Sequence, residues 1–259
     1  MDLGLQDKVI IVTGGSSGIG AEISRGIAGE GGIPVIATLD EAPTRAMEEA
    51  FREAGLPMHA IITELGEAES SQAVIEETLS KYGRIDGLVN NAGINDGASL
   101  ESGPEAFRKS LQTNLFHAYD LMHYALSALQ ASQGVVLNIA SKVALTGQGN
   151  TSGYAAAKGA LLGLTREWAV ALLPYSVRVN AILPAEVMTP LYRKWLDTHY
   201  EDPAAGERQI TERIPLQNRM TTAEEIAHTA LFLLSNKSSH TTGQFYFVDG
   251  GYVHLDRRI

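Results

Sequence analysis

The segment Val9–Gly20, which reads VIIVTGGSSGIG, determines the fold that we expect for this chain. The apolar run Val9–Val12 predicts a buried strand, and the pattern Ile19–Glu30 predicts a helix that opens directly after the glycines. Glycines between a strand and a helix allow a tight turn, and they let the backbone approach a pyrophosphate resting on the helix N-terminus. The segment therefore predicts the first unit of a dinucleotide-binding fold. The competing reading is a glycine-rich turn without a ligand.

Short apolar runs alternate with helical patterns along the rest of the chain. The expected strands are Val9–Val12, Pro34–Leu39, His59–Thr63, Leu88–Val89, Gly134–Ile139, Val177–Ile182 and Gln244–Val248. The expected helices include Ile19–Glu30, Ala42–Ala54, Ser71–Tyr82 and Ala155–Leu172. Such alternation predicts an α/β fold of the Rossmann type, a doubly wound parallel seven-stranded sheet with helices on both faces. Because no linker or repeat divides the chain, residues 1–259 are predicted to form a single domain.

The composition excludes several classes of protein. The 259 residues are 44% hydrophobic and 19% charged, carry a net charge of −10 and contain no cysteine. Disulfides, thiolate nucleophiles and cysteine metal sites are therefore excluded, and no metal is expected. The negative charge argues against nucleic-acid partners and anionic membranes. The N-terminal residues lack a signal-peptide pattern and no apolar run reaches the ~18 residues of a membrane helix, so we expect a cytoplasmic protein.

Two segments depart from the regular alternation. Ala155–Leu172 is apolar on nearly every side, so a second subunit is expected to cover the face that does not pack on the sheet. Burial within a monomer is the alternative. The segment from 189 to 221 is a long insertion that contains Tyr192, Trp195 and Tyr200, and it is expected to form a substrate-binding lid.

Tyr154 and Lys158 are spaced so that they share one helix face, one turn apart. A phenol ordinarily titrates near ~10. A cation about 4 Å away contributes up to roughly 4 kcal/mol at an effective dielectric of ~20. Lys158 is therefore expected to lower the pKa of Tyr154 towards neutrality, where a general base works best. A surface tyrosine beside a solvated lysine is the alternative interpretation of this pair alone.

Over nearly its whole length the chain resembles the short-chain dehydrogenase/reductase family. The resemblance rests on the spacing of Gly14, Gly18 and Gly20, on the motif Asn90–Gly93, and on the segment Pro184–Thr189. It also rests on Asn114, Ser141, Tyr154 and Lys158, which fall where the family places its catalytic tetrad. The resemblance implies that Tyr154 exchanges the substrate hydroxyl proton and that Ser141 hydrogen-bonds the reacting oxygen. It also implies that Lys158 holds the nicotinamide ribose and that Asn114 positions a water in a proton relay.

The expected cofactor is NAD or NADP, and its binding residues are taken from the motifs above. They are Gly14, Ser16, Ser17, Gly18, Ile19, Gly20, Asp40, Glu64, Leu65, Asn91, Ala92, Gly93, Tyr154, Lys158, Pro184, Val187 and Thr189. An acidic residue after the second strand accepts hydrogen bonds from the ribose 2′-hydroxyl and repels a 2′-phosphate. Asp40 lies one residue later than the expected position, Ser17 is neutral, and Arg45 cannot be placed from the sequence. These residues favour NAD and leave dual use open.

Polar residues flank the catalytic motifs and indicate a polar substrate such as a sugar. The expected substrate-binding residues are Asn95, Ser141, Gln148, Asn150, Tyr154, Glu186 and Trp195. Three stretches, Ser141–Tyr154, Pro184–Pro190 and Asp249–Asp256, resemble bacterial sugar dehydrogenases that act on L-fucose and oxidise its anomeric hydroxyl to the lactone. The family resemblance also implies a homotetramer in which residues 252–259 reach another subunit.

Three functions remain open at this point. The first is an aldose dehydrogenase for L-fucose or a configurationally related sugar. The second is a dehydrogenase or reductase for apolar ketones or alcohols, such as steroids or acyl thioesters, which the aromatic residues of the lid would suit. The third is a dinucleotide-binding module without turnover, although such a module would not need the complete tetrad.

Overall fold

The computed structural model describes residues 2–255, and it contains the predicted seven-stranded parallel sheet. The strands stand in the order β3-β2-β1-β4-β5-β6-β9, and a two-stranded sheet pairs β7 with β8. The strands are β1 (Val9–Thr13), β2 (Ile33–Thr38), β3 (His59–Ile62), β4 (Gly87–Asn90), β5 (Val135–Ile139), β6 (Arg178–Pro184), β7 (Val187–Met188), β8 (Thr221–Thr222) and β9 (Phe245–Val248). The α-helices are α1 (Gly18–Gly29), α2 (Glu41–Glu53), α3 (Ala68–Tyr82), α4 (Gly103–Leu111), α5 (His117–Ser132), α6 (Val143–Thr146), α7 (Ser152–Ala171), α8 (Pro190–His199), α9 (Pro203–Thr211) and α10 (Ala223–Leu234).

The order of the strands fixes where a ligand can bind. β1 pairs in parallel with both β2 and β4, so the chain first winds outwards through β2 and β3 and then returns past β1. At such a switch point the loops that leave neighbouring strands diverge and open a crevice at their carboxyl ends. The glycine-rich loop leaves β1 there and the Asn90–Gly93 motif leaves β4, as the sequence predicts.

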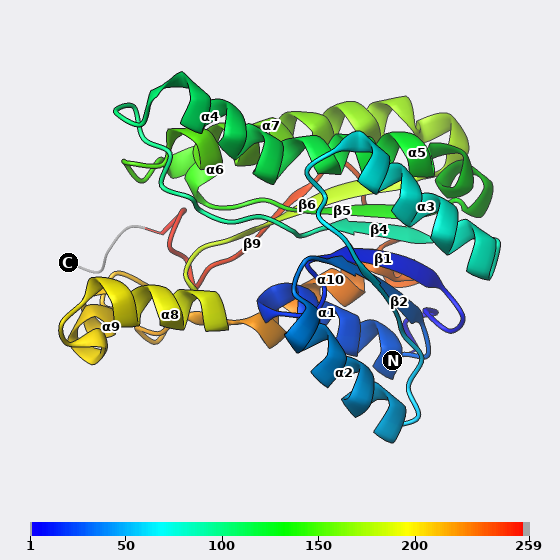
Figure 1. Ribbon diagram of the computed structural model, residues 1–259, viewed down its shortest axis with the longest axis horizontal. Coiled ribbons are helices and arrows are strands. Elements are labelled where there is room, and N and C mark those ends of the chain that lie inside the picture. Colours follow the sequence, from blue (N-terminus) through cyan, green and yellow to red (C-terminus); the bar gives the residue numbers. More distant parts are fainter. Residues whose placement is uncertain (1, 256–259) are drawn as a thin grey trace.

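Helices cover both faces of the sheet (Figure 1). On one face, α1 and α10 pack against each other and enclose an apolar cluster with β1, β5 and β6, in which Ile23, Ile27 and Ile226 are fully buried. On the other face, α3, α5 and α7 enclose a second cluster that contains Leu121, Leu129 and Trp168. Fully buried central strands explain why β1 and β5 carry continuous apolar runs rather than an alternating pattern.

The helical region from 103 to 132 was not predicted from the sequence. It holds α4, the π-helix η1 (Gln112–Phe116) and α5 in direct succession. Two 3-10 turns, η2 (Leu173–Tyr175) and η3 (Asn236–Ser238), complete the described elements. No helix of residues 2–255 is long and apolar enough to cross a membrane.

The helix α7 is covered on more sides by its own chain than the sequence indicates. It packs on β6, and α4, α6 and η1 lie against it as well. Its solvent face carries Ala156, Gly163 and Arg166 and exposes Val170, which is 66% accessible. Part of the apolar circumference that was predicted to need a second subunit is thus buried within the chain.

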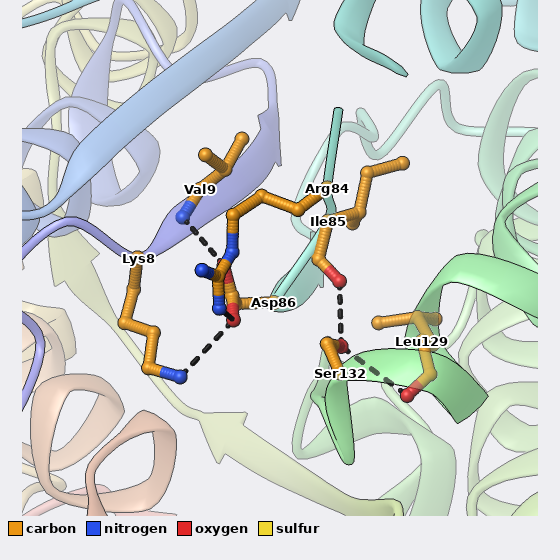
Figure 2. A network of polar contacts seen from close by, with 7 residues as sticks. All are labelled: Lys8, Val9, Arg84, Ile85, Asp86, Leu129 and Ser132. Atoms are coloured by element: carbon orange, nitrogen blue, oxygen red, sulfur yellow. Dashed lines mark hydrogen bonds and ion pairs between the residues drawn. The ribbon is translucent and has the colours of Figure 1, made fainter. Parts of the chain in front are cut away.

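A buried carboxylate ties two strands together at the amino edge of the sheet (Figure 2). Asp86, directly before β4, accepts hydrogen bonds from the Val9 backbone N–H at 3.0 Å and from the side chains of Lys8 at 3.1 Å and Arg84 at 2.6 and 2.7 Å. Burial acts to raise the pKa of the Asp86 carboxyl, but these hydrogen bonds and the Lys8 charge hold it below its ordinary value. This network lies at the edge of the sheet opposite the crevice and has a structural role.

Candidate active site

The glycine-rich loop has the shape that a pyrophosphate needs. Gly14 and Gly18 have φ angles of +61° and +52°, which residues with a side chain rarely adopt. A Cβ at Gly20 would lie 2.3 Å from the Gly14 carbonyl oxygen, so the loop can close onto α1 only if this residue is glycine. The first turn of α1 contains no acidic residue, which leaves its positive end available to an anion. The loop therefore fits a dinucleotide.

Hydrogen bonds from the loop after β4 hold the glycine-rich loop in place. The side-chain amide of Asn91 donates to the carbonyl oxygens of Thr13 and Gly14 at 2.8 and 3.3 Å. The buried Thr13 hydroxyl accepts the backbone N–H groups of Asn91 and Ala92, both at 2.9 Å. Thr13 was not among the predicted site residues. Its signal in the sequence is a hydroxyl at the end of an otherwise apolar strand.

The structure brings the four predicted catalytic residues to one place. Lys158 is buried, its ammonium lies 5.6 Å from the centroid of the Tyr154 ring, and it donates to the Ile139 carbonyl oxygen at 2.8 Å. Ser141, just beyond the end of β5, presents its hydroxyl to the Tyr154 phenol. Asn114 lies on η1 and is also fully buried.

The predicted ionisation of Tyr154 is wrong for the structure of the chain by itself. Burial, against the lowering effect of the Ser141 hydroxyl and with a smaller contribution from the Glu186 carboxylate, raises the pKa of the Tyr154 phenol to about 12. Burial also lowers the pKa of the Lys158 ammonium to about 8. The sequence argument assumed a charged lysine in a half-solvated setting. In the structure, the loss of solvation outweighs the attraction between the two groups.

The π-helix η1 orients the side chain of Asn114. Its Oδ1 accepts the Ile94 backbone N–H at 2.7 Å, and its Nδ2 donates to the Ser110 carbonyl oxygen at 3.0 Å. A Cβ at Gly93 would lie 2.9 Å from this Oδ1 and 3.3 Å from the Lys158 Nζ. Gly93 is therefore the residue that lets the loop after β4 pass directly over Asn114 and Lys158.

A buried histidine that the sequence analysis did not single out lies near Lys158. His117, the first residue of α5, is buried, and its ring lies against the backbone of Thr113 and Ala92. Burial, and to a smaller extent the charge of Lys158, lower the pKa of His117 to about 4. The imidazole is therefore neutral at physiological pH.

The segment after β6 adds a charge pair next to the catalytic residues. Glu186 forms an ion pair with Lys142, which follows Ser141, and it accepts the Tyr192 hydroxyl at 2.7 Å. The Tyr252 ring lies over the Lys142 ammonium, 3.9 Å from the ring centroid. Tyr252 thus contacts Lys142 of its own chain, and residues 256–259 of the segment that was predicted to reach another subunit lie outside the described residues. Pro184 and Val187 are buried beside this pair, and Thr189 caps α8 by accepting the Tyr192 N–H at 3.1 Å.

The other predicted substrate residues lie on exposed loops and on α8. Asn95 is exposed and accepts the Thr151 hydroxyl, and Gln148 and Asn150 are exposed on the loop between α6 and α7. Trp195 is 40% accessible on α8 and its ring stacks on His199, with the centroids 4.9 Å apart.

At the end of β2 the structure places the residues that concern the choice of cofactor. Asp40 is exposed at the N-terminus of α2, and Leu39 beside it is 64% accessible. Arg45 pairs with Glu41 one turn earlier on α2. Beyond β3, Glu64 is exposed, whereas Leu65 packs against the core cluster under α3 and α5.

Comparison with known proteins agrees with this site. A family model described as enoyl-(acyl carrier protein) reductase matches residues 14–253. This chain belongs to the short-chain dehydrogenase/reductase family, and it is an NAD(P)-dependent dehydrogenase that acts on CH–OH groups.

Individual proteins that are similar to this chain include several sugar dehydrogenases. The L-fucose dehydrogenase of Rattus norvegicus is 38% identical over 246 residues, which cover 94% of this chain and 88% of that protein. The crystal structure of Cj0485 dehydrogenase superposes with a TM-score of 0.94 at 45% identity and covers 100% of this chain and 99% of that one. The aldohexose dehydrogenase of Thermoplasma acidophilum gives a TM-score of 0.90 at 29% identity, with 100% and 99% coverage.

Proposed function

We propose that this protein oxidises the anomeric hydroxyl of an aldose, L-fucose or a configurationally related sugar, to the lactone. The observation that carries the proposal is the buried Lys142–Glu186 pair, which lies beside Tyr154 where an apolar substrate would need an apolar wall. The similarity to an L-fucose dehydrogenase over most of the chain and to an aldohexose dehydrogenase structure supports the same substrate class.

The residues have the following roles in this proposal. Gly14–Gly20, Asn91–Gly93 and Pro184–Thr189 hold the cofactor, whose nicotinamide ring accepts the hydride when it is bound. Ser141 donates a hydrogen bond to the reacting oxygen, and Tyr154 exchanges its proton. Burial lowers the pKa of Lys158 to about 8, whereas that of the phenol is about 12. The neutral amine form of Lys158 is therefore the group that accepts the proton from Tyr154, and the fraction of this form rises as the pH approaches 8. Asn114, held by the backbone at both ends of its amide, orients the relay beyond Lys158.

NAD is the proposed cofactor of preference. Asp40 is the acidic group nearest the end of β2, and Arg45, the cation that the sequence could not place, is paired with Glu41. Within the described residues, this turn thus offers no unpaired cationic side chain that could bind a 2′-phosphate.

A panel of substrates tests the proposal. Aldoses, secondary alcohols and 3-oxoacyl thioesters are each assayed with NAD(H) and NADP(H) at 340 nm, together with the variant Tyr154→Phe. We expect the highest kcat/KM for an aldose with NAD, and a loss of at least about 100-fold in Tyr154→Phe with unchanged cofactor affinity. Turnover of a ketone but of no aldose would support the second hypothesis. Cofactor binding without any turnover would support the third.

We also propose that residues 189–221 form a lid and that the protein is a cytoplasmic homotetramer. The segment contains α8 and α9, and its aromatic cluster of Tyr192, Trp195 and Tyr200 flanks Glu186. Exposed apolar residues on η1, α5 and α7, among them Phe116, Tyr119 and Val170, offer a surface for other subunits. Light scattering measures the oligomeric state, and a monomer would contradict this part of the proposal.

A further inference from the structure

Lys142 occupies an unusual position for a charged residue. It follows Ser141 directly, its side chain is only 7% accessible, and its backbone N–H donates to the Pro184 carbonyl oxygen at 2.9 Å. That bond ties the segment carrying Ser141 to the segment carrying Glu186. The ammonium then pairs with the Glu186 carboxylate and lies under the Tyr252 ring.

Three elements from distant parts of the sequence meet at this pair. Lys142 comes from the end of β5 and Glu186 from the end of β6, and Tyr192 reaches Glu186 from the lid helix α8. The catalytic phenol is close enough for the Glu186 charge to act on its pKa. Because Lys142 directly follows Ser141, whose hydroxyl meets the Tyr154 phenol, the charge pair lies next to the catalytic residues.

Stability does not explain this arrangement. A buried ion pair loses so much solvation that apolar residues of the same size often replace it without loss of stability. The Asp86 network differs, because its carboxylate also satisfies the Val9 backbone N–H and joins β1 to β4. Among the described residues, the side chains of Lys142 and Glu186 instead satisfy no backbone group: the ammonium pairs with the carboxylate, and the carboxylate accepts the Tyr192 hydroxyl. The charges of the pair are available to groups that can both donate and accept hydrogen bonds, as vicinal hydroxyls do.

We propose that Lys142, Glu186 and Tyr192 form a hydroxyl-binding subsite that recognises two adjacent hydroxyls of a polyhydroxylated substrate, and that Tyr252 covers it. The inference rests on the proposed function, and it names the residues that select the sugar. The carboxylate accepts a hydrogen bond from one hydroxyl, and the ammonium donates to the other. A substrate that lacks one of these hydroxyls leaves a hydrogen-bonding position of the pair unfilled, and sites that hydrogen-bond a substrate hydroxyl discriminate strongly against analogues without it.

A thermodynamic cycle tests the subsite by combining substitutions in the protein with removal of single hydroxyls from the substrate. Lys142→Met and Lys142→Arg are assayed in the full chain with the best aldose and with each of its monodeoxy analogues. We expect Lys142→Met to lose about 100-fold in kcat/KM with the parent aldose. With the deoxy analogue that lacks the recognised hydroxyl, we expect a loss of under about 5-fold, because the interaction is already absent. Lys142→Arg retains the charge and recovers part of the activity, and the Kd of the cofactor stays unchanged in both variants.

Lys8→Met is the matched control. Lys8 is also a partly buried lysine paired with a carboxylate, but it lies at the opposite edge of the sheet, and Asp86 keeps its bonds to Arg84 in the variant (Figure 2). We expect its kcat/KM to equal that of the unmodified protein for every sugar. If Lys142→Met does not fold, Tyr192→Phe tests the same cycle through the loss of a single hydroxyl.

The outcomes separate the two proposals. If the protein turns over aldoses but the substitution and each deoxy analogue act additively, the subsite is overturned and the proposed function stands. If the protein turns over no aldose at all, the proposed function fails and the subsite fails with it.

Discussion

At the scale of single residues, the buried position that Lys158 needs for its proposed role destabilises the folded protein. Burial lowers its pKa from 10.5 to about 8, which corresponds to about 3 kcal/mol of destabilisation at any pH below 8. Lys158→Met removes this cost but leaves the Ile139 carbonyl oxygen without its donor, which costs about 1–2 kcal/mol. We therefore expect the variant to be more stable by about 1–2 kcal/mol at pH 7 and to be inactive. Urea unfolding measures the first effect and the standard assay the second.

The stability cost of burying Lys158 depends on pH. The unfolded lysine is charged below 10.5 and the folded one below about 8, so the cost decreases as the pH rises between these values. The advantage of Lys158→Met should decrease in the same window. A variant that is less stable than the unmodified protein at pH 7 would show that the hydrogen bond to Ile139 outweighs the cost of burial.

The same residue shows what the sequence can and cannot predict about the site. The spacing of Tyr154 and Lys158 identified the pair, and the structure brings it together with Ser141 and Asn114. The protonation states were predicted wrongly, because they depend on how much solvent the surrounding chain removes. That quantity comes from the packing of α4, α6 and η1 on α7, which no local pattern contains.

At the scale of elements, η1 and the loop after β4 form one unit through Gly93. A side chain at this position would press on Asn114 and Lys158, at 2.9 and 3.3 Å from the new Cβ. Both neighbours are buried and are held by hydrogen bonds to backbone groups. We therefore expect Gly93→Ala to lower kcat by about 10- to 100-fold and to destabilise the protein by about 1–3 kcal/mol. Steady-state kinetics and thermal unfolding measure the two effects.

Gly163→Ala is the control for this substitution. Gly163 lies on the exposed face of α7, and a Cβ there meets no atom of the described residues within 4 Å. Alanine favours the helix by about 0.5–1 kcal/mol, so the control should be slightly more stable and fully active. Full activity of Gly93→Ala would show that the loop can shift without disturbing the tetrad.

The elements themselves were predicted unevenly. The seven strands follow from short apolar runs between glycines, and each lies within two residues of its expected ends. The region of α4 and α5 was missed, because η1 continues from one helix into the next and no proline or glycine marks the junction. The helices α8 and α9 begin at Pro190 and Pro203, which are signals of a helix start that the sequence analysis did not use.

At the scale of the whole molecule, two buried groups set the response of the fold to acid. Burial lowers the pKa of His117 to about 4, against 6.5 in the unfolded chain. As the pH falls from 6.5 to 4, the unfolded state therefore binds a proton that the folded state does not. The fold loses about 3 kcal/mol from this residue over that window. The Asp86 carboxyl, whose pKa is also lowered, adds a further loss as the pH falls below its ordinary value of 3.8.

A histidine variant separates these two contributions. His117→Leu places an apolar side chain of similar size at this buried position and removes the group that titrates. The free energy of unfolding of the variant should therefore change by less than about 1 kcal/mol between pH 7 and pH 4.5. That of the unmodified protein should fall by about 2–3 kcal/mol over the same range. Urea unfolding at half-unit pH steps gives both curves. His228→Leu, at a solvated position on α10, is the matched control and should follow the unmodified protein. If His117→Leu keeps the full pH dependence above 4.5, the imidazole is protonated inside the fold and another group must supply the sensitivity to acid.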